Sequence, residues 1–293
     1  MHDIEIKRMR VLYLSILLGV MMSACKVKTQ ENEINDVVED QIDSTTVADV
    51  PSDLLVEEEE KETRRIDESF IDFIYSFTRN EKIQASRIIF PLPNYALNEK
   101  ILIDKENWQF DPLFTRMDTY TNIYESNSEL EIEEDTSATS AQLEWIFLKE
   151  KKIRRYYFER IEGLWKLEAI DNAAILKEEP SSSEDFFTFY ERFANDSVFQ
   201  LQRTSNPLKF VTYDPDDEFS ILETTLDAGQ FMAFSPTLPK DTLTNVNYGQ
   251  NTLSHSNVMI IEMKGNGNGF SNTFYFKRRN GLWKLTQYDD LSD

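Results

Sequence analysis

The chain has 293 residues, a formal net charge of −22, two histidines and one cysteine. So acidic a chain repels polyanions, which argues against nucleic acid as a partner. With so few histidines and cysteines, a multi-histidine metal site, a disulfide framework and a histidine triad in each half are excluded, and we expect no metal and no cofactor.

The N-terminus is typical of a secretory signal peptide. Basic residues within 7–10 precede an apolar run, 11–22, that is too short to cross a membrane as a mature helix. Residues 22–25, Met-Ser-Ala-Cys, resemble a bacterial lipobox, whose cysteine is lipidated and becomes the first residue of the mature protein. The alternative is an ordinary signal peptide with a chance cysteine. The resemblance implies lipid attachment at Cys25, with the anchor as the only membrane contact and no thiol left for chemistry.

Residues 25–66 are polar and acidic, with four consecutive glutamates at 57–60 and few aromatic residues. This composition predicts a disordered tether, which charge repulsion extends so that the body stands away from the membrane. Lys26 replaces the aspartate that marks inner-membrane retention in lipoproteins, so we expect an outer-membrane lipoprotein that faces the periplasm.

After the tether, Phe70, Phe73, Ile74 and Phe77 follow the i, i+3, i+4, i+7 spacing of one apolar helix face. The same pattern returns 116 residues later, and other residues recur at that offset. The recurring positions are Phe186, Phe189, Tyr190 and Phe193, then Gln84 with Gln200, Arg87 with Arg203, and Pro91-Leu92 with Pro207-Leu208.

The ends of the two copies also match, now at an offset of 118. Gly163-Leu164-Trp165-Lys166-Leu167 recurs as Gly281-Leu282-Trp283-Lys284-Leu285, preceded in both copies by Tyr-Phe-x-Arg. Blocks in register at both ends predict an internal duplication with one small insertion. Alternating and aromatic runs predict three antiparallel strands at the end of each copy. These strands cover 143–148, 155–161 and 165–170 in the first copy, and 258–263, 273–278 and 283–288 in the second.

Helices followed by antiparallel strands that end in Gly-Leu-Trp-Lys-Leu resemble a nuclear transport factor two-like domain. The whole chain also resembles a family of Gram-negative lipoproteins of unknown function, on its lipobox, acidic spacer, residues 87–92 (Arg-Ile-Ile-Phe-Pro-Leu) and residues 156–158 (Tyr-Tyr-Phe). The resemblance implies an α+β fold of two tandem cone-shaped domains, 67–175 and 181–293, each with N-terminal helices packed on a curved antiparallel sheet. It implies no particular activity, because this fold hosts enzymes, binding modules and scaffolds.

Four duplicated polar residues, Gln84, Arg87, Gln200 and Arg203, are the leading site candidates. Their i, i+3 spacing places each pair on one helix face, where it could line a pocket for an anionic ligand. The alternative, which we favour, is a structural role in which buried arginines join the helix to the sheet.

Other candidates have plainer interpretations. Asp72 with Tyr75 could serve acid–base catalysis, but Asp72 points away from the apolar face. The glycine-rich segment 265–269 lacks phosphate-loop spacing and predicts a hairpin turn, and the basic run 149–155 predicts a solvated turn. Trp165 and Trp283 could stack on glycans, although equivalent strand positions usually fill equivalent cores. We therefore assign no catalytic residue.

These patterns favour a lipid-anchored binding or scaffold module of the cell envelope, whose partner is an envelope protein or a small ligand. One alternative is a histidine-free isomerase or hydrolase that uses a buried carboxylate in one cone. Another is capture of a small molecule or glycan. A deep apolar pocket with a carboxylate of raised pKa would favour the enzyme, whereas cones filled by aromatic side chains would exclude it.

Overall fold

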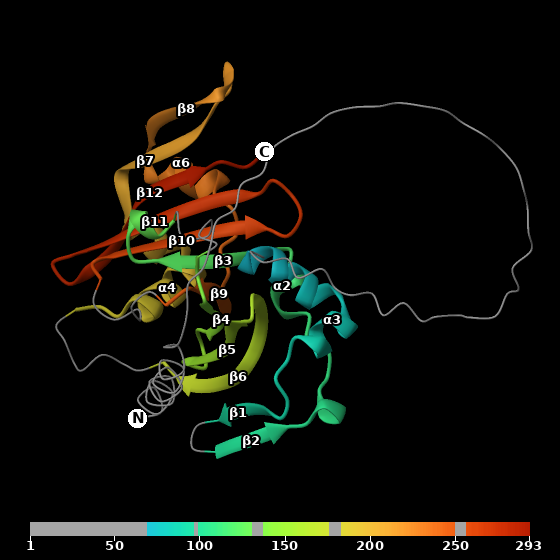
Figure 1. Ribbon diagram of the computed structural model, residues 1–293. Helices are drawn as coiled ribbons and strands as arrows, with labels where there is room; N and C mark the ends of the chain where they lie inside the picture. The colour runs from blue at the N-terminus through green and yellow to red at the C-terminus, as the bar shows by residue number, and fades with distance from the viewer. Residues whose placement is uncertain (1–68, 97–98, 131–136, 176–182, 250–255) are drawn as a thin grey trace, which may run out of the picture. The chain divides into compact units, whose positions relative to one another are not determined.

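The computed structural model describes residues 69–96, 99–130, 137–175, 183–249 and 256–293 (Figure 1). The predicted signal peptide, Cys25 and the predicted tether lie outside these residues. The first half contains, in chain order, α2 (Phe70–Arg79), α3 (Glu81–Ser86), β1 (Leu92–Ala96), β2 (Glu99–Ile103), η1 (Lys105–Asn107), η2 (Leu113–Arg116), β3 (Thr119–Tyr124), η3 (Asn127–Glu129), β4 (Ser140–Phe147), β5 (Lys152–Ile161) and β6 (Leu164–Ala174). The second half contains α4 (Phe186–Asn195), α5 (Ser197–Gln202), β7 (Thr204–Asp214), β8 (Asp217–Leu226), α6 (Ala228–Phe234), β9 (Thr242–Asn247), β10 (Val258–Gly265), β11 (Ser271–Arg279) and β12 (Leu282–Asp290).

The first helix of each half begins at a capping side chain and buries the predicted apolar face. The Ser69 hydroxyl accepts a hydrogen bond from the Asp72 N–H (3.1 Å), and the Asp185 carboxylate accepts one from the Thr188 N–H (2.8 Å). Each side chain satisfies a backbone N–H that the helix leaves without a partner. The residues of both apolar faces are buried, as predicted: Phe70, Phe73, Ile74 and Phe77 in α2, and Phe186, Phe189, Tyr190 and Phe193 in α4.

The two halves build six-stranded sheets with the same strand order. One sheet runs β2-β1-β6-β5-β4-β9 and the other β8-β7-β12-β11-β10-β3. The six predicted strands correspond to β4, β5 and β6 and to β10, β11 and β12. Each sheet also contains one parallel pair, β1 with β6 and β7 with β12. The sequence predicted antiparallel sheets, and this one pair in each sheet departs from that prediction. The repeated order is what an internal duplication requires.

Each sheet takes its last strand from the other half of the chain. β3, from the first half, pairs with β10, and β9, from the second half, pairs with β4; both pairs are antiparallel. Figure 1 shows β3 lying beside β10 among strands of the second half. The sheets are thus interlocked by a reciprocal exchange. The predicted ranges 67–175 and 181–293 divide the sequence repeat, but they do not divide the two sheets.

The exchanged strands meet at a pair of buried threonines. The N–H of Thr121 donates to the hydroxyl of Thr244 (2.7 Å), and the hydroxyl of Thr121 donates to the carbonyl of Thr244 (2.7 Å). The reverse pair of bonds, from Thr244 to Thr121, measures 2.8 and 2.8 Å. Because each threonine satisfies both the N–H and the carbonyl of the other, the crossing leaves no unpaired polar group at this point.

A buried polar chain continues from this crossing into the first sheet. Asn245 on β9 accepts from the N–H of Ile123 (2.8 Å) and donates from Nδ2 to the carboxylate of Glu144 (2.9 Å). Glu144, which is 3% exposed, also accepts from the Nε of Arg155 (2.9 Å), and Arg155 lies 3.6 Å from the Asp171 carboxylate. A buried carboxylate needs such partners to remain charged, so β9 is locked into the sheet by more than its ladder bonds.

Two aromatic cores hold the helices against the sheets. In the first, Phe70 packs edge-on against Trp165 with ring centroids 5.1 Å apart; in the second, Phe186 packs against Trp283 in the same way at 5.0 Å. The second core also includes side chains from the first sheet, namely Ile146, Leu148, Ile153 and Leu243. The second core therefore contains side chains from both halves of the chain and from both sheets.

Candidate functional site

Gln84, one of the predicted candidates, fixes the loop that follows η1. Its Nε2 donates to the carbonyls of Phe77 (3.1 Å) and Asp111 (2.8 Å). Its Oε1 accepts from the Nε1 of Trp108 (3.0 Å) and from the N–H of Asp111 (2.9 Å). The side chain is 0% exposed, so these bonds replace all contact with water. Gln84 thus holds the loop 108–111 in place.

The two predicted arginines lie where a helix pair meets its sheet. The Nη1 of Arg87 donates to the carbonyl of Trp165 (3.4 Å), and the Nη1 of Arg203 donates to the carbonyl of Trp283 (2.9 Å). Arg203 also forms a two-pronged ion pair with Glu184, with N–O distances of 3.0 and 3.2 Å. These contacts fit the structural alternative for both arginines.

Gln200 differs from its counterpart Gln84. It is half-buried, and its backbone carbonyl accepts a hydrogen bond from the Thr204 hydroxyl (2.8 Å). Within the described chain, no partner is found for its side-chain amide. The four predicted residues therefore do not gather in one site, and only Gln84 contacts the wall of a pocket.

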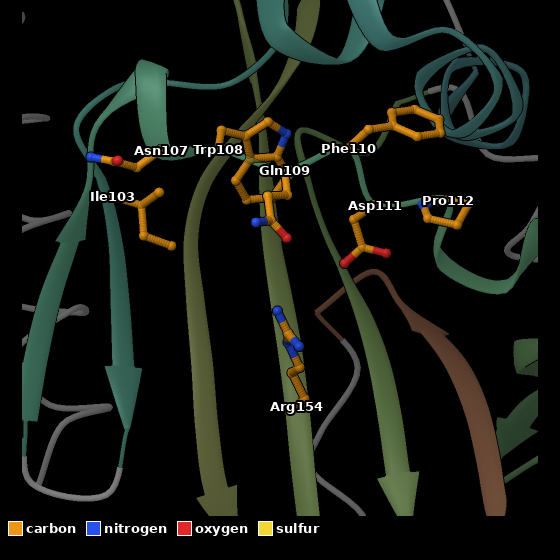
Figure 2. Close-up of a pocket in the computed structure, with 8 residues that line it drawn as sticks. All are labelled: Ile103, Asn107, Trp108, Gln109, Phe110, Asp111, Pro112 and Arg154. Carbon is orange, nitrogen blue, oxygen red and sulfur yellow. The ribbon is translucent and has the colours of Figure 1, made fainter.

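That pocket has a volume of about 310 Å³ and opens to solvent between the loop 108–111, the end of β2 and strand β5 (Figure 2). It is lined by Ile103, Asn107, Trp108, Gln109, Phe110, Asp111, Pro112 and Arg154. The lining joins an apolar and aromatic wall to two amides, one guanidinium and one carboxylate. Concave sites that mix apolar walls with a few fixed polar groups are typical of small-ligand sites, and this volume lies at the small end of their range.

Arg154 is the cationic residue among those that line the pocket. It projects from β5, and Figure 2 shows its guanidinium pointing toward the side chains of Gln109 and Asp111. The guanidinium carbon lies 4.9 Å from the centre of the Tyr156 ring. Its Nε is buried and has no hydrogen-bond partner among the described residues, whose carboxylates all lie beyond ion-pair distance of Arg154. The guanidinium thus has no carboxylate partner among the described residues, and the Nη groups at its far end can pair with a bound acceptor.

Asp111 is already engaged by the protein. Its Oδ1 accepts from the N–H of Leu113 (2.9 Å), and its Oδ2 accepts from the hydroxyl of Tyr156 (2.7 Å). The first bond supports the left-handed backbone of Leu113, at φ 47°. Burial, followed by the Asp111 charge, raises the pKa of Tyr156 above its ordinary value, so the phenol stays protonated and keeps donating. Asp111 therefore anchors the loop to β5.

The equivalent region of the second half is filled by side chains. Asn272 stands 118 residues after Arg154, is 2% exposed, and accepts a hydrogen bond from the hydroxyl of Tyr288. The Tyr288 ring is packed by Phe210, Phe231 and Phe274, at centroid distances of 5.5, 5.3 and 5.1 Å. The two halves thus differ most at the place where the first half has its pocket.

Among the described carboxylates, neither Asp289 nor the candidate Asp72 lines the pocket. Asp289 is 7% exposed, and burial raises its pKa, while hydrogen bonds from Gln287 and Tyr275 oppose the rise. Asp72 is exposed and accepts a hydrogen bond from the Ser69 hydroxyl (2.8 Å), and the Tyr75 hydroxyl reaches Asn266 at 3.5 Å. The geometry therefore gives the enzymatic alternative no support.

The tryptophans of the duplicated motif are not available to glycans. Trp165 and Trp283 are each 1% exposed inside the two cores, as expected from their equivalent strand positions, so the glycan alternative does not apply to them. The glycine-rich segment 265–269 joins β10 to β11, as predicted for a hairpin turn. The Asn266 side chain in this turn donates to the carbonyls of Phe114 (2.9 Å) and Met117 (2.7 Å). The turn 265–269 therefore has a structural role.

Residues 152–155 of the basic run 149–155 lie in a strand, whereas the sequence predicted a solvated turn for the run and a strand only from residue 155. The turn ends before Lys152, and Arg154 and Arg155 lie within β5. Successive residues of a strand face opposite sides, so Arg155 reaches Glu144 while Arg154 reaches the pocket. The alternation of 154, 156 and 158 on one face was the signal in the sequence that could have identified Arg154.

Among the described residues, no cluster of histidine, cysteine and carboxylate side chains is able to hold a metal ion. No helix in the described ranges is long and apolar enough to cross a membrane.

The fold is similar to that of a solved protein. The chain resembles the crystal structure of an NTF2-like protein from Bacteroides fragilis NCTC 9343 with 47% sequence identity and a TM-score of 0.74, over 78% of this chain and 98% of that chain. This similarity shows the predicted nuclear transport factor two-like α+β fold. No curated protein matches the chain. A family profile described as a domain of unknown function, DUF4348, matches residues 48–290. The chain therefore belongs to the DUF4348 family.

Proposed function

We propose that the protein is a small-ligand binding module of the cell envelope, carried on a lipid anchor at Cys25. The observation that carries the proposal is the contrast between the halves. The first has an open pocket lined by Arg154, whose guanidinium pairs with none of the described carboxylates, whereas the second fills the equivalent region with Tyr288 and its aromatic neighbours. A ligand with an acceptor group supplies a partner for this guanidinium in the first half.

The construction of the pocket supports binding rather than scaffolding alone. Gln84 places Trp108 and Asp111 by three hydrogen bonds, and Asp111 ties the loop to Tyr156 on β5. A wall held this firmly loses little entropy when a ligand binds, which favours affinity. In this proposal the second half supports the first through the exchanged strand β9 and needs no ligand of its own.

A ligand screen by thermal unfolding of the full chain tests the proposal. A ligand that binds the native state raises the melting temperature by an amount that grows with the logarithm of its concentration above the Kd. We expect saturable stabilisation by small ligands, and its loss in Gln109→Trp, where an indole added at an exposed lining residue fills the opening.

Gln202→Trp, which makes the same change at an exposed position at the end of α5, is the matched control and should bind like the wild type. If no member of a broad panel of small molecules stabilises the chain, the binding function is refuted. If ligands bind equally well to both variants, the pocket is not the binding site.

A further inference from the structure

We infer that the ligand of this pocket is a small organic anion, whose charged group pairs with Arg154 and whose apolar part lies against Trp108. The inference rests on the proposed function and specifies its ligand class. Among the lining residues, Arg154 supplies a positive charge that no described carboxylate pairs with.

The guanidinium is well suited to this role. It stays charged at all physiological pH values and presents several N–H donors in one plane, the geometry that carboxylates, sulfates and phosphates bind in two-pronged fashion. Its flat face is already supported by the Tyr156 ring at 4.9 Å, so its orientation is set before the ligand arrives. The donor edge then faces the space between Gln109 and Asp111, as Figure 2 shows.

Asp111 faces the same pocket, and its carboxylate repels a bound anion. The strength of this repulsion depends on the hydrogen bonds that the carboxylate already accepts. Each of its two oxygens already accepts one hydrogen bond, from the Leu113 N–H and from the Tyr156 hydroxyl. These donors spread part of its charge into the protein. The neighbouring side chain of Gln109 is an exposed amide that points toward Arg154 and can donate to an anion. The local donor set therefore favours an anion despite the carboxylate at the rim.

The overall charge of −22 also repels anions, but salt weakens this repulsion. At physiological salt the repulsion between exposed charges fades over about 8 Å, whereas a contact with a partly buried guanidinium is screened much less. Specific binding of an anion by an acidic protein thus depends on the local pair with Arg154. It follows that removal of this one charge should abolish the preference.

The organic part of the ligand follows from the remaining walls. Ile103 and Trp108 line the same space and are half-buried, which leaves apolar surface in contact with water in the empty pocket. A flat hydrocarbon or aromatic group that covers this surface gains burial free energy in addition to the charge pair. An inorganic anion would leave these walls wet and should bind more weakly.

Three flat probes of nearly equal size separate the alternatives: benzoate, neutral benzamide and cationic benzylamine. Isothermal titration of the full chain should show benzoate binding at least roughly tenfold more tightly than the other two, the effect of one charge-assisted hydrogen-bonded pair. Arg154→Gln should remove this preference. Arg154→Lys should keep part of it, because the charge remains while the planar donor pair is lost.

Arg116→Gln is the matched control, since it removes the same charge from an exposed position outside the lining. It should bind benzoate like the wild type. Equal affinity for benzoate and benzamide, unchanged in Arg154→Gln, overturns the anion inference but leaves the binding function intact. Preference for benzylamine also overturns it and assigns the dominant charge to Asp111.

Quenching of tryptophan fluorescence by iodide gives a further test of the charge at Arg154. Trp108 and Trp145 are half-buried, whereas the other two tryptophans are buried in the cores, so a Trp145→Phe background reports mainly on Trp108. Iodide should quench this signal more strongly than in Arg154→Gln, while neutral acrylamide should quench both proteins alike. Equal iodide quenching, together with no benzoate binding at millimolar concentration, overturns the inference.

Discussion

Gln84 and Gln200 occupy repeated positions in the sequence, yet only the side chain of Gln84 takes part in a hydrogen-bond network among the described residues. Gln84→Leu removes the partners of the Trp108 indole N–H and of both backbone groups of Asp111, all of which are held inside the protein. We expect a loss of about 3 kcal/mol in the free energy of unfolding, near 1 kcal/mol for each group left unsatisfied.

Gln200→Leu is the matched comparison in the second half, and it should change the free energy of unfolding by less than about 0.5 kcal/mol. Urea titration monitored by circular dichroism measures both variants. Equal losses in the two variants would show that the difference in hydrogen bonding has no energetic weight.

Asp289 is the second residue at which the halves diverge. Its counterpart in the first half, Asp171, lies 3.6 Å from Arg155, but Thr273 stands where the second half would need that arginine. Burial consequently raises the pKa of Asp289 in the folded state above its unfolded value. Such a group favours the folded state while it is protonated in both states, and this contribution is lost as the pH rises through the folded pKa.

Asp289→Asn should therefore raise the melting temperature at pH 7 and have little effect at pH 3, below the unfolded pKa. Melting curves of both proteins across this range give the comparison. A melting temperature that falls at pH 7 would mean that the carboxylate charge stabilises the folded state, contrary to this sign.

At the scale of elements, the sequence predicted the first helix and the final three strands of each half because their patterns are strong. The apolar faces of α2 and α4 repeat at helical spacing, and the Gly-Leu-Trp turn is explicit. β3 and β9 were not predicted, although they share Thr-x-Thr-Asn, because their offset is 123 and their partners lie in the other half. Pairing between distant segments depends on tertiary contacts, which local patterns do not encode.

The pocket was likewise only partly predictable. Gln84 was identified from the repeat, but its role depends on Trp108 and Asp111, 24 and 27 residues away. Arg154 has no counterpart at the repeated position, where the second half has Asn272, so a search for repeated polar residues passed over it. A comparison of the two halves identifies only residues that both halves share, so it cannot identify a site that is present in one half alone.

The exchange of β3 and β9 makes a specific prediction for a cleaved chain. If a protease site is inserted between residues 175 and 183 and the chain is cut there, the two fragments should remain together, because each holds a strand of the other's sheet. They should elute as one species from a native size-exclusion column and separate only in denaturant. Separation in native buffer would contradict the interlocked sheets.

At the scale of the whole molecule, the anchor decides where binding takes place. If Cys25 is lipidated, Cys25→Ala should move the protein from the membrane fraction to the soluble fraction without changing its melting temperature. Cell fractionation with an antibody measures the distribution. An unchanged membrane fraction would refute the anchor, while the fold and the pocket would be unaffected.

Fluorine NMR of the full chain tests whether the first half binds a small ligand in the pocket beside Trp108. Protein labelled with 5-fluorotryptophan reports on all four tryptophans, of which Trp108 lines the pocket while Trp165 and Trp283 are buried in the two cores. On titration with benzoate, the Trp108 signal, assigned with Trp108→Phe, should shift saturably while the two core signals stay in place. A Trp108 signal that does not move with benzoate or with any ligand from the thermal screen, or equal shifts of all four signals, would contradict the claim.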